Sequence, residues 1–327
     1  MKQEIIVAQI EKLVQDDVIP GASFAFVTAT ESQSFVIGDS QVQPTREPLQ
    51  QNMLYDLASV TKVVGTTTRI FQLIAQGKLT FDTKVAKLLP RFKLLDVTLK
   101  DLLLHQAGLP GDFSNKHQLS QADLIEAIYQ CEQPIYPIGS QTLYSDIGYI
   151  LLGWIIEVFD GSLGQGMQKF IFEPLEMTNT GYHLAQPLSR FVPTECTKER
   201  GCIRGKCHDH KAFLLAGESG SAGLFSTLTD LIHFVQMMLN QGCYQGKEVL
   251  SSVAFDWLKE YQQGSRTLGW EVLQPDIYYH TGFTGTSLLV DMKRQNGFIL
   301  LTNRIHPSRD NQAFVEARKE IVARFIS

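Results

Sequence analysis

The 327-residue sequence has no apolar run of membrane-spanning length and no cluster of basic residues. Its 29 Lys and Arg against 34 Asp and Glu give a formal net charge of -5, and both signs are spread along the chain. We therefore expect neither a nucleic acid nor a membrane as a partner. Segment 1–10 carries charged and amide side chains where a secretory signal needs an apolar core, so we expect a cytoplasmic protein.

The sequence is also poor in cysteine, with five residues that form no Cys-x-x-Cys pair: Cys131, Cys196, Cys202, Cys207 and Cys243. This odd number favours reduced thiols over a disulfide framework. One loop offers candidate zinc ligands whose spacing matches no standard finger or ribbon: Cys196, Cys202, Cys207, His208 and His210. We assign no metal and no cofactor, and we keep a metal-binding loop as an alternative.

Strand-like runs cluster at the two ends of the sequence, and helical patterns lie between them. Short apolar runs bounded by turn residues predict strands at 22–28 and 34–37, and again at 267–273, 277–280, 286–291 and 298–302. This order predicts an α+β fold whose sheet subdomain is built from 1–75 and 217–327. Residues 76–216 are predicted to form a mostly helical subdomain, with the active site between the two.

Ser59 and Lys62 stand one helical turn apart at the start of a predicted helix, 63–76. A serine hydroxyl is a weak nucleophile at neutral pH and needs a neighbouring base, which a partly desolvated lysine can provide. The pair alone is weak evidence, because a helix N-cap followed by a solvated lysine has the same pattern. The rest of the sequence has to decide between these two interpretations.

Two further motifs follow in order. Tyr144-Ser145-Asp146 precedes a predicted helix at 146–159, and His280-Thr281-Gly282 ends a predicted strand. With Ser59-x-x-Lys62, this order resembles the serine β-lactamase and penicillin-binding-protein superfamily, specifically its class C-like branch. Four sequence segments are also similar to segments of that family: 98–110, 144–153, 174–177 and 222–227. The resemblance extends over about residues 15–305.

The resemblance implies a β-lactamase/transpeptidase-like fold: an antiparallel five-stranded sheet flanked by terminal and central helices, plus a mostly helical subdomain. It also implies that Ser59 attacks an acyl carbonyl and carries the acyl group, while Lys62 and Tyr144 share the proton transfers. The N–H groups of Ser59 and Phe283 would hold the developing oxyanion. Phe283 is therefore expected beside the substrate.

Four more positions are expected to contact the substrate: Asp146, His280, Thr281 and Gly282. Two of them depart from the family pattern. His280 stands where many members have lysine, so a cation that meets a substrate carboxylate would depend on pH. Asp146 stands where many members have asparagine, and its carboxylate disfavours an anionic substrate unless Lys62 neutralises it. Asp146 could instead be only the N-cap of the helix that follows.

These observations predict a serine hydrolase that acts on a small molecule through an acyl-enzyme on Ser59. The substrate would be a β-lactam, a D-alanyl peptide or a small carboxylic ester. An α/β-hydrolase is excluded because the sequence contains no Gly-x-Ser-x-Gly. Two alternatives stay open: a penicillin-binding receptor that is acylated without efficient turnover, and a non-catalytic interaction protein organised around the metal-binding loop. His105, on an otherwise apolar helix, is expected to be structural.

Overall fold

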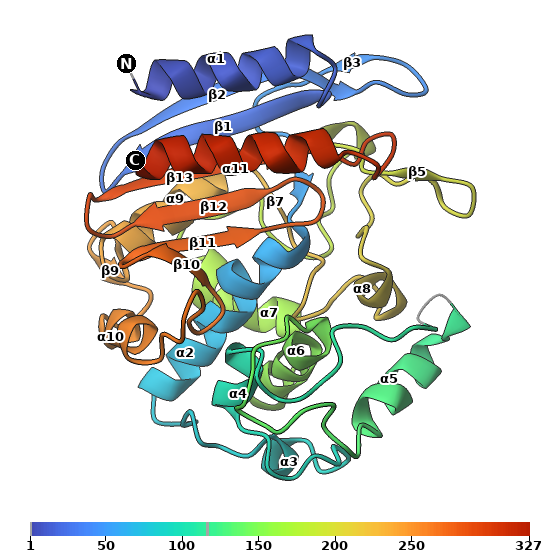
Figure 1. Ribbon diagram of the computed structural model, residues 1–327, viewed down its shortest axis with the longest axis vertical. Helices are drawn as coiled ribbons and strands as arrows, with labels where there is room; N and C mark the ends of the chain where they lie inside the picture. The colour runs from blue at the N-terminus through green and yellow to red at the C-terminus, as the bar shows by residue number, and fades with distance from the viewer. Residues whose placement is uncertain (1, 116–117) are drawn as a thin grey trace.

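The computed structural model describes residues 2–115 and 118–327 and is built around one large antiparallel sheet (Figure 1). The strands of the sheet are β1 (Gly21–Thr28), β2 (Ser32–Gln41), β3 (Glu47–Pro48), β10 (Glu271–Gln274), β11 (Ile277–Thr281), β12 (Ser287–Asp291) and β13 (Asn296–Thr302). Their order is β10-β11-β12-β13-β1-β2-β3, so the two ends of the chain meet at β1 and β13. The α+β prediction is confirmed. The strand number is corrected from five to seven, because the short β3 and β10 extend the two edges.

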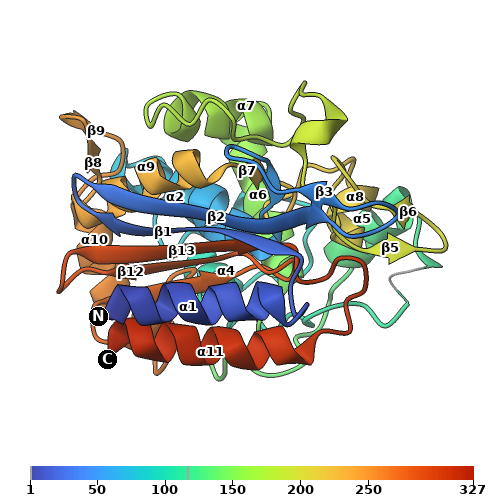
Figure 2. The same ribbon diagram turned by 90° about the horizontal axis from the view of Figure 1, so that it is seen from above.

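Two terminal helices cover one face of the sheet. α1 (Lys2–Gln15) and α11 (Gln312–Ile326) lie side by side there (Figure 2). Successive side chains of a strand point to opposite faces, so Phe24 of β1 packs against these helices while Ala25 faces the other way. Ile6 and Ile10 of α1 are fully buried in this layer, as the helical spacing predicts.

The opposite face of the sheet packs against α9 (Leu228–Leu239), and α2 (Thr68–Ala75) and α6 (Asp146–Asp160) lie beyond it (Figure 1). The remaining helices are α3 (Val85–Leu88), α4 (Leu99–Leu103), α5 (Gln121–Tyr129), α7 (Leu163–Met167), α8 (His210–Leu214) and α10 (Val253–Glu260). Within the described residues no single helix is both long enough and apolar enough to cross a membrane. Only α6 and segment 163–172 together have that length and composition, and a bend of 74° separates them.

Local sequence signals set several helix starts. Thr98 and Asp101 form a capping box at α4, in which each side chain accepts from the other's backbone N–H. At α6 the possible N-cap role of Asp146 is corrected, because the N-cap is Ser145, whose hydroxyl accepts from the N–H of Gly148. Asp146 is the first residue inside the helix, and its side chain is left for other contacts.

The expectation of reduced thiols is wrong for one pair. Cys196 and Cys202 form a disulfide across the hairpin of β5 (Cys196–Thr197) and β6 (Gly201–Cys202). Cys131, Cys207 and Cys243 are free. The disulfide takes two of the candidate zinc ligands, and residues 2–115 and 118–327 contain no group of three or more His, Cys, Asp or Glu side chains that could hold a metal.

Candidate active site

The segment that carries Ser59 is tightly constrained. A 3-10 turn (Ala58–Val60) continues into a π-helical segment (Lys62–Thr67) and then into α2. Ala58 adopts a φ of +46°, which is unusual for a residue with a side chain and typical of strained functional sites. The N–H of Ala58 donates to Asp56 Oδ1 at 2.9 Å and helps to hold this conformation.

The end of β11 lies directly against the same segment. A Cβ on Gly282 would come within 2.4 Å of the Leu57 carbonyl oxygen, so only glycine allows this close approach. Thr286 Oγ1 donates to the Leu57 carbonyl at 3.0 Å, and Thr284 Oγ1 donates to the Asp56 carbonyl at 2.7 Å. The glycine and the two hydroxyls thus fix residues 281–283 beside Ser59.

Lys62 is completely buried and makes three hydrogen bonds from its Nζ atom. The acceptors are Ser59 Oγ at 2.9 Å, Asp146 Oδ1 at 2.8 Å and the Ser221 carbonyl at 2.7 Å. Burial by itself lowers the pKa of Lys62, but the Asp146 carboxylate and Tyr144 outweigh it, so the pKa is raised. Three acceptors and a raised pKa both indicate a protonated lysine in the resting site.

Asp146 lies between two ammonium groups. Its Oδ1 accepts from Lys62, and its Oδ2 lies 3.1 Å from Nζ of Lys211, a buried residue of α8. Burial raises the pKa of Asp146, but the two lysines together reverse the effect and hold it below the ordinary value. The neutralisation expected from Lys62 therefore comes from both lysines.

Tyr144 and Ser59 line one cavity, and the Tyr144 ring lies next to Lys62. Lys62 Nζ lies 5.1 Å from the centre of the Tyr144 ring, and the His105 ring lies 4.5 Å from it. His105 Nδ1 accepts from the N–H of Ser145, and Ser145 Oγ donates to the Pro110 carbonyl. His105 is thus a structural residue, as expected, and burial lowers its pKa to about 3.

His280 does not fit its expected role as a cation for a substrate carboxylate. Its side chain is buried beside Tyr144 and Trp270, with ring centres 6.3 and 6.5 Å away. Burial, followed by the charges of Lys62 and Arg266, holds its pKa well below the ordinary value. Burial and the lowered pKa both favour the neutral imidazole, which argues against the expected pH-dependent cation at this position.

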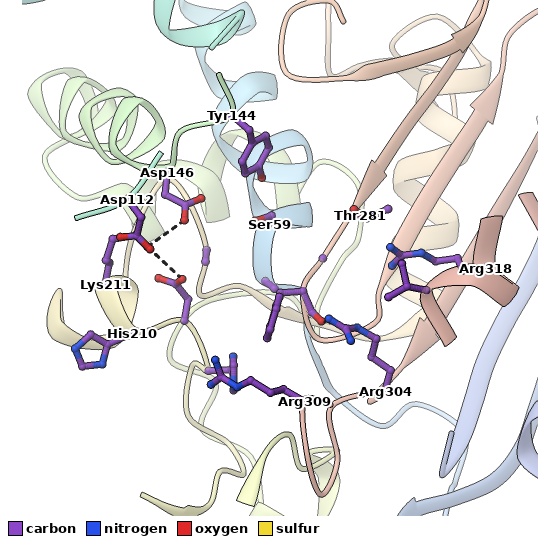
Figure 3. A pocket seen from close by; sticks show the side chains of 17 residues that line it. Ser59, Asp112, Tyr144, Asp146, His210, Lys211, Thr281, Arg304, Arg309 and Arg318 are labelled. Carbon is purple, nitrogen blue, oxygen red and sulfur yellow. Dashed lines mark hydrogen bonds and ion pairs between the residues drawn. The ribbon is translucent and has the colours of Figure 1, made fainter. Parts of the chain in front are cut away.

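The cavity has a volume of about 530 Å³, and Ser59 lies at its centre (Figure 3). The expected residues that line it are Ser59, Tyr144, Asp146, Thr281, Gly282 and Phe283. Sequence reasoning missed the charged residues around them, which are Asp112, Asp209, Lys211, Arg304, Arg309 and Arg318. Only Asp112 had a signal, because it follows the Gly-Leu-Pro turn at 108–110. The others come from elements that approach Ser59 only in the folded chain.

The fold and the match to a family model and to named relatives place the protein in one class, the serine β-lactamase and penicillin-binding-protein superfamily. More specifically, the chain belongs to the Beta-lactamase family, whose sequence model matches residues 6–322. Together with the named relatives below, this assigns the chain to the serine hydrolases of that superfamily.

Two relatives and one solved structure illustrate the similarity. An N-acetylmuramyl-L-alanine amidase of Bacillus subtilis (strain 168) is 32% identical, over 79% of this chain and 69% of the relative. A protein of Escherichia coli (strain K12), provisionally named a D-alanyl-D-alanine carboxypeptidase, is 31% identical over 79% of this chain and 71% of its own. The crystal structure of a beta-lactamase/D-alanine carboxypeptidase from Pseudomonas syringae shares the fold, with a TM-score of 0.80, 20% identity and coverage of 99% of this chain and 98% of the other.

Proposed function

We propose that the protein hydrolyses a small amide or ester through an acyl-enzyme on Ser59. The observation that carries this proposal is the hydrogen bond from Lys62 Nζ to Ser59 Oγ, at 2.9 Å, in a cavity that also holds Tyr144. A hydroxyl that accepts from an ammonium keeps its own hydrogen available for a second partner. Ser59 is therefore placed to lose its proton to a group other than Lys62.

We assign that proton transfer to Tyr144, whose ring centre lies 5.1 Å from Lys62 Nζ. Ser59 Oγ bonds to the acyl carbon as the bond to the leaving group breaks. Tyr144 passes the serine proton to the leaving group, and a water molecule then releases the acid and restores the hydroxyl. The N–H groups of Ser59 and Phe283 stabilise the oxyanion without reorganisation, since both are fixed by the backbone.

The substrate candidates are a D-alanyl peptide, a small carboxylic ester and a β-lactam. The names of the two relatives support amide cleavage in peptides that contain alanine. The cavity is large enough for a dipeptide-sized molecule. No resident metal or cofactor has a place in this reaction, because the nucleophile and the proton carriers are side chains of the protein.

The first prediction tests Ser59. Replacing Ser59 by Ala should abolish the covalent adduct with a fluorophosphonate, measured by intact mass, and lower kcat/KM for ester hydrolysis by at least a thousandfold. The melting temperature should stay close to wild type, because Ser59 is partly exposed and loses a single hydrogen bond. Ser140→Ala, an exposed serine outside the cavity, is the matched control and should keep both adduct and activity.

The same adduct distinguishes turnover from trapping. A hydrolase should lose a penicillin- or ester-derived adduct from Ser59 as product appears in more than one equivalent. A persistent adduct with one equivalent of product would support a receptor that is acylated once. An adduct that survives the Ser59→Ala substitution would refute the proposal altogether.

A further inference from the structure

His208 lies in the wall of the cavity and is held from several sides. Its main-chain N–H donates to Asp56 Oδ2 at 2.7 Å, and its carbonyl accepts from Arg200 Nη1 at 3.0 Å. Its ring Nε2 lies 2.9 Å from Glu195 Oε2. The residue is buried, with 8% of its surface exposed. Contacts to the main chain and to the side chain together fix the position of the imidazole ring.

Glu195 is anchored independently of His208. Both of its carboxylate oxygens pair with the Arg309 guanidinium, and Arg309 Nε donates to Oε1 at 2.7 Å. The hydrogen bonds from Arg309 are the largest cause of a pKa of about 2 for Glu195. The Glu195 carbonyl also accepts from the N–H of Ile203 at 3.0 Å. A change in the His208 side chain therefore leaves no buried carboxylate without a partner.

The His208 ring stacks on the ring of Phe283, with 5.5 Å between the ring centres and 17° between the planes. Phe283 lies in the turn that follows β11, between Gly282 and a second glycine, Gly285, whose φ is +117°. Glycines on both sides give this turn conformational freedom. The Phe283 side chain is 45% exposed, so it has protein neighbours on only part of its surface.

Two guanidinium groups also lie near the Phe283 ring. Those of Arg304 and Arg309 are 4.9 and 5.6 Å from its centre. Arginine side chains are long and rotatable, and that of Arg309 is half exposed. The imidazole of His208 is short and buried by comparison. Its flat surface is thus the more rigid support for the Phe283 ring.

Asp56 connects His208 to both halves of the proposed oxyanion site. Its Oδ1 accepts from the N–H of Ala58, one residue before the nucleophile, at 2.9 Å, while its Oδ2 accepts from His208. Its main-chain carbonyl accepts from Thr284 Oγ1, one residue after Phe283, at 2.7 Å. Asp56 is only 2% exposed. One buried residue therefore sets the distances between the segments that carry the nucleophile, His208 and Phe283.

We propose that His208 is a positioning residue for the hydrolysis at Ser59. Its ring holds the Phe283 side chain so that the N–H of Phe283 points at the carbonyl oxygen of the substrate. A donor that is aimed in advance stabilises the oxyanion at no cost in reorganisation. His208 acts through Phe283 and does not touch the reacting atoms. This inference rests on the proposed function and adds a residue to its oxyanion site.

Three substitutions of His208 test the role of the ring. His208→Ala removes the ring and keeps the N–H that binds Asp56, and it should lower kcat for p-nitrophenyl acetate by about 10- to 100-fold. KM should change by less than about threefold, because the oxyanion develops only in the transition state. His208→Phe keeps a flat ring and should stay within about threefold of wild type. His208→Gln keeps a polar group that can reach Glu195 but has no ring, and should resemble His208→Ala.

A double-mutant cycle with Phe283→Ala shows whether the ring acts through Phe283. In the Phe283→Ala background, His208→Ala should change kcat by less than about twofold, because the ring has lost its stacking partner. Independent effects of the two substitutions would multiply. The matched control is His233→Ala, which removes a ring 5.0 Å from that of Tyr244, outside the residues that line the cavity. It should keep the wild-type kcat.

The outcomes separate this inference from the proposed function. A kcat of His208→Ala within threefold of wild type, or effects that multiply in the cycle, would overturn the positioning role. Equal activity of the Phe and Gln variants would also overturn it, and this comparison decides the question if His208→Ala does not fold. Absence of a fluorophosphonate adduct on Ser59 of the wild type would instead remove the proposed function.

Discussion

At the scale of single residues, the surroundings of a side chain decide its charge, and the sequence shows those surroundings only when they are local. The structural role of His105 could be anticipated from the apolar helix beside it, but its partner Ser145 could not, because the two residues are 40 positions apart. The charge of Asp146 could not, because Lys211 approaches from a helix more than sixty positions away. The same reason applies to His280. That many family members have lysine at this position gives no information about the rings of Tyr144 and Trp270, which lie beside the histidine in the folded chain.

The neutral state of His280 leads to a pH prediction. Because burial holds the pKa of His280 well below 6.5, we expect the neutral imidazole to dominate between pH 5.5 and 8.5, with no cation to lose as pH rises. The ratio of kcat/KM for N-acetyl-D-alanyl-D-lactate to that for its neutral lactamide should therefore stay constant, within about twofold, over this range. Steady-state kinetics at half-unit steps measures it. A tenfold fall in the ratio centred near pH 6.5 would restore His280 as the carboxylate site.

At the scale of elements, one buried ion pair joins the helix that follows Ser59 to the helix that follows Tyr144. Arg69 of α2 makes two hydrogen bonds to Asp160 of α6, Nε to Oδ2 at 2.7 Å and Nη2 to Oδ1 at 2.8 Å. Both side chains are buried, at 0% and 3% exposed. Gly166 leaves room for this carboxylate, since a Cβ there would lie 2.3 Å from Asp160 Oδ2.

Removing one partner of this pair should destabilise the fold strongly. Arg69→Met leaves Asp160 buried without its partner and should lower the free energy of unfolding by about 3 to 5 kcal/mol. The double variant Arg69→Met/Asp160→Leu should recover more than half of that loss, because the stranded charge is gone. Urea unfolding measures all three proteins. Arg91→Met breaks an exposed pair with Glu126 and should cost about 1 kcal/mol or less. Equal losses in the single and double variants would mean that the methylene packing of Arg69, and not the charge pair, is what matters.

Helices and strands could be predicted where the residues that determine them lie within the element or directly beside it in the sequence. The capping box of Thr98 and Asp101 marks the start of α4. Asn296 and Gly297, a pair typical of hairpin turns, are instead the first two residues of β13 and pair with Asp291 and Val290. The edge strand β3 was not predicted, because it consists of Glu47 and Pro48, which have no strand pattern and pair only because β2 runs beside them. The other edge strand, β10, overlaps the predicted strand at 267–273.

At the scale of the whole molecule, the Cys196–Cys202 disulfide determines how many cysteine thiols can react with a thiol reagent. Native protein purified without reductant should expose three thiols to a thiol reagent after unfolding, from Cys131, Cys207 and Cys243, and five after reduction. Cys196→Ser should raise the unreduced count to four, or lower it to two if Cys202 forms a new disulfide with one of the three free cysteines, and intact mass distinguishes the two results. Five thiols in unreduced wild type would show that the hairpin closes without the bond, as the cytoplasmic expectation requires.

The pairing of β1 with β13 has a consequence for how the chain reaches its fold. Ala22 is aligned with Thr302, so the middle of the sheet joins residues from opposite ends of the sequence. A contact this distant closes a very long loop before it gains any stability, which slows folding. During synthesis, β1 and β2 leave the ribosome before β13, and the apolar face around Phe24 has only α1 to cover it until α11 is made. The sheet that presents Thr281 to Phe283 beside Ser59 is thus among the last parts to form, and the edge of β1 that pairs with β13 stays open while residues 29–295 are synthesised.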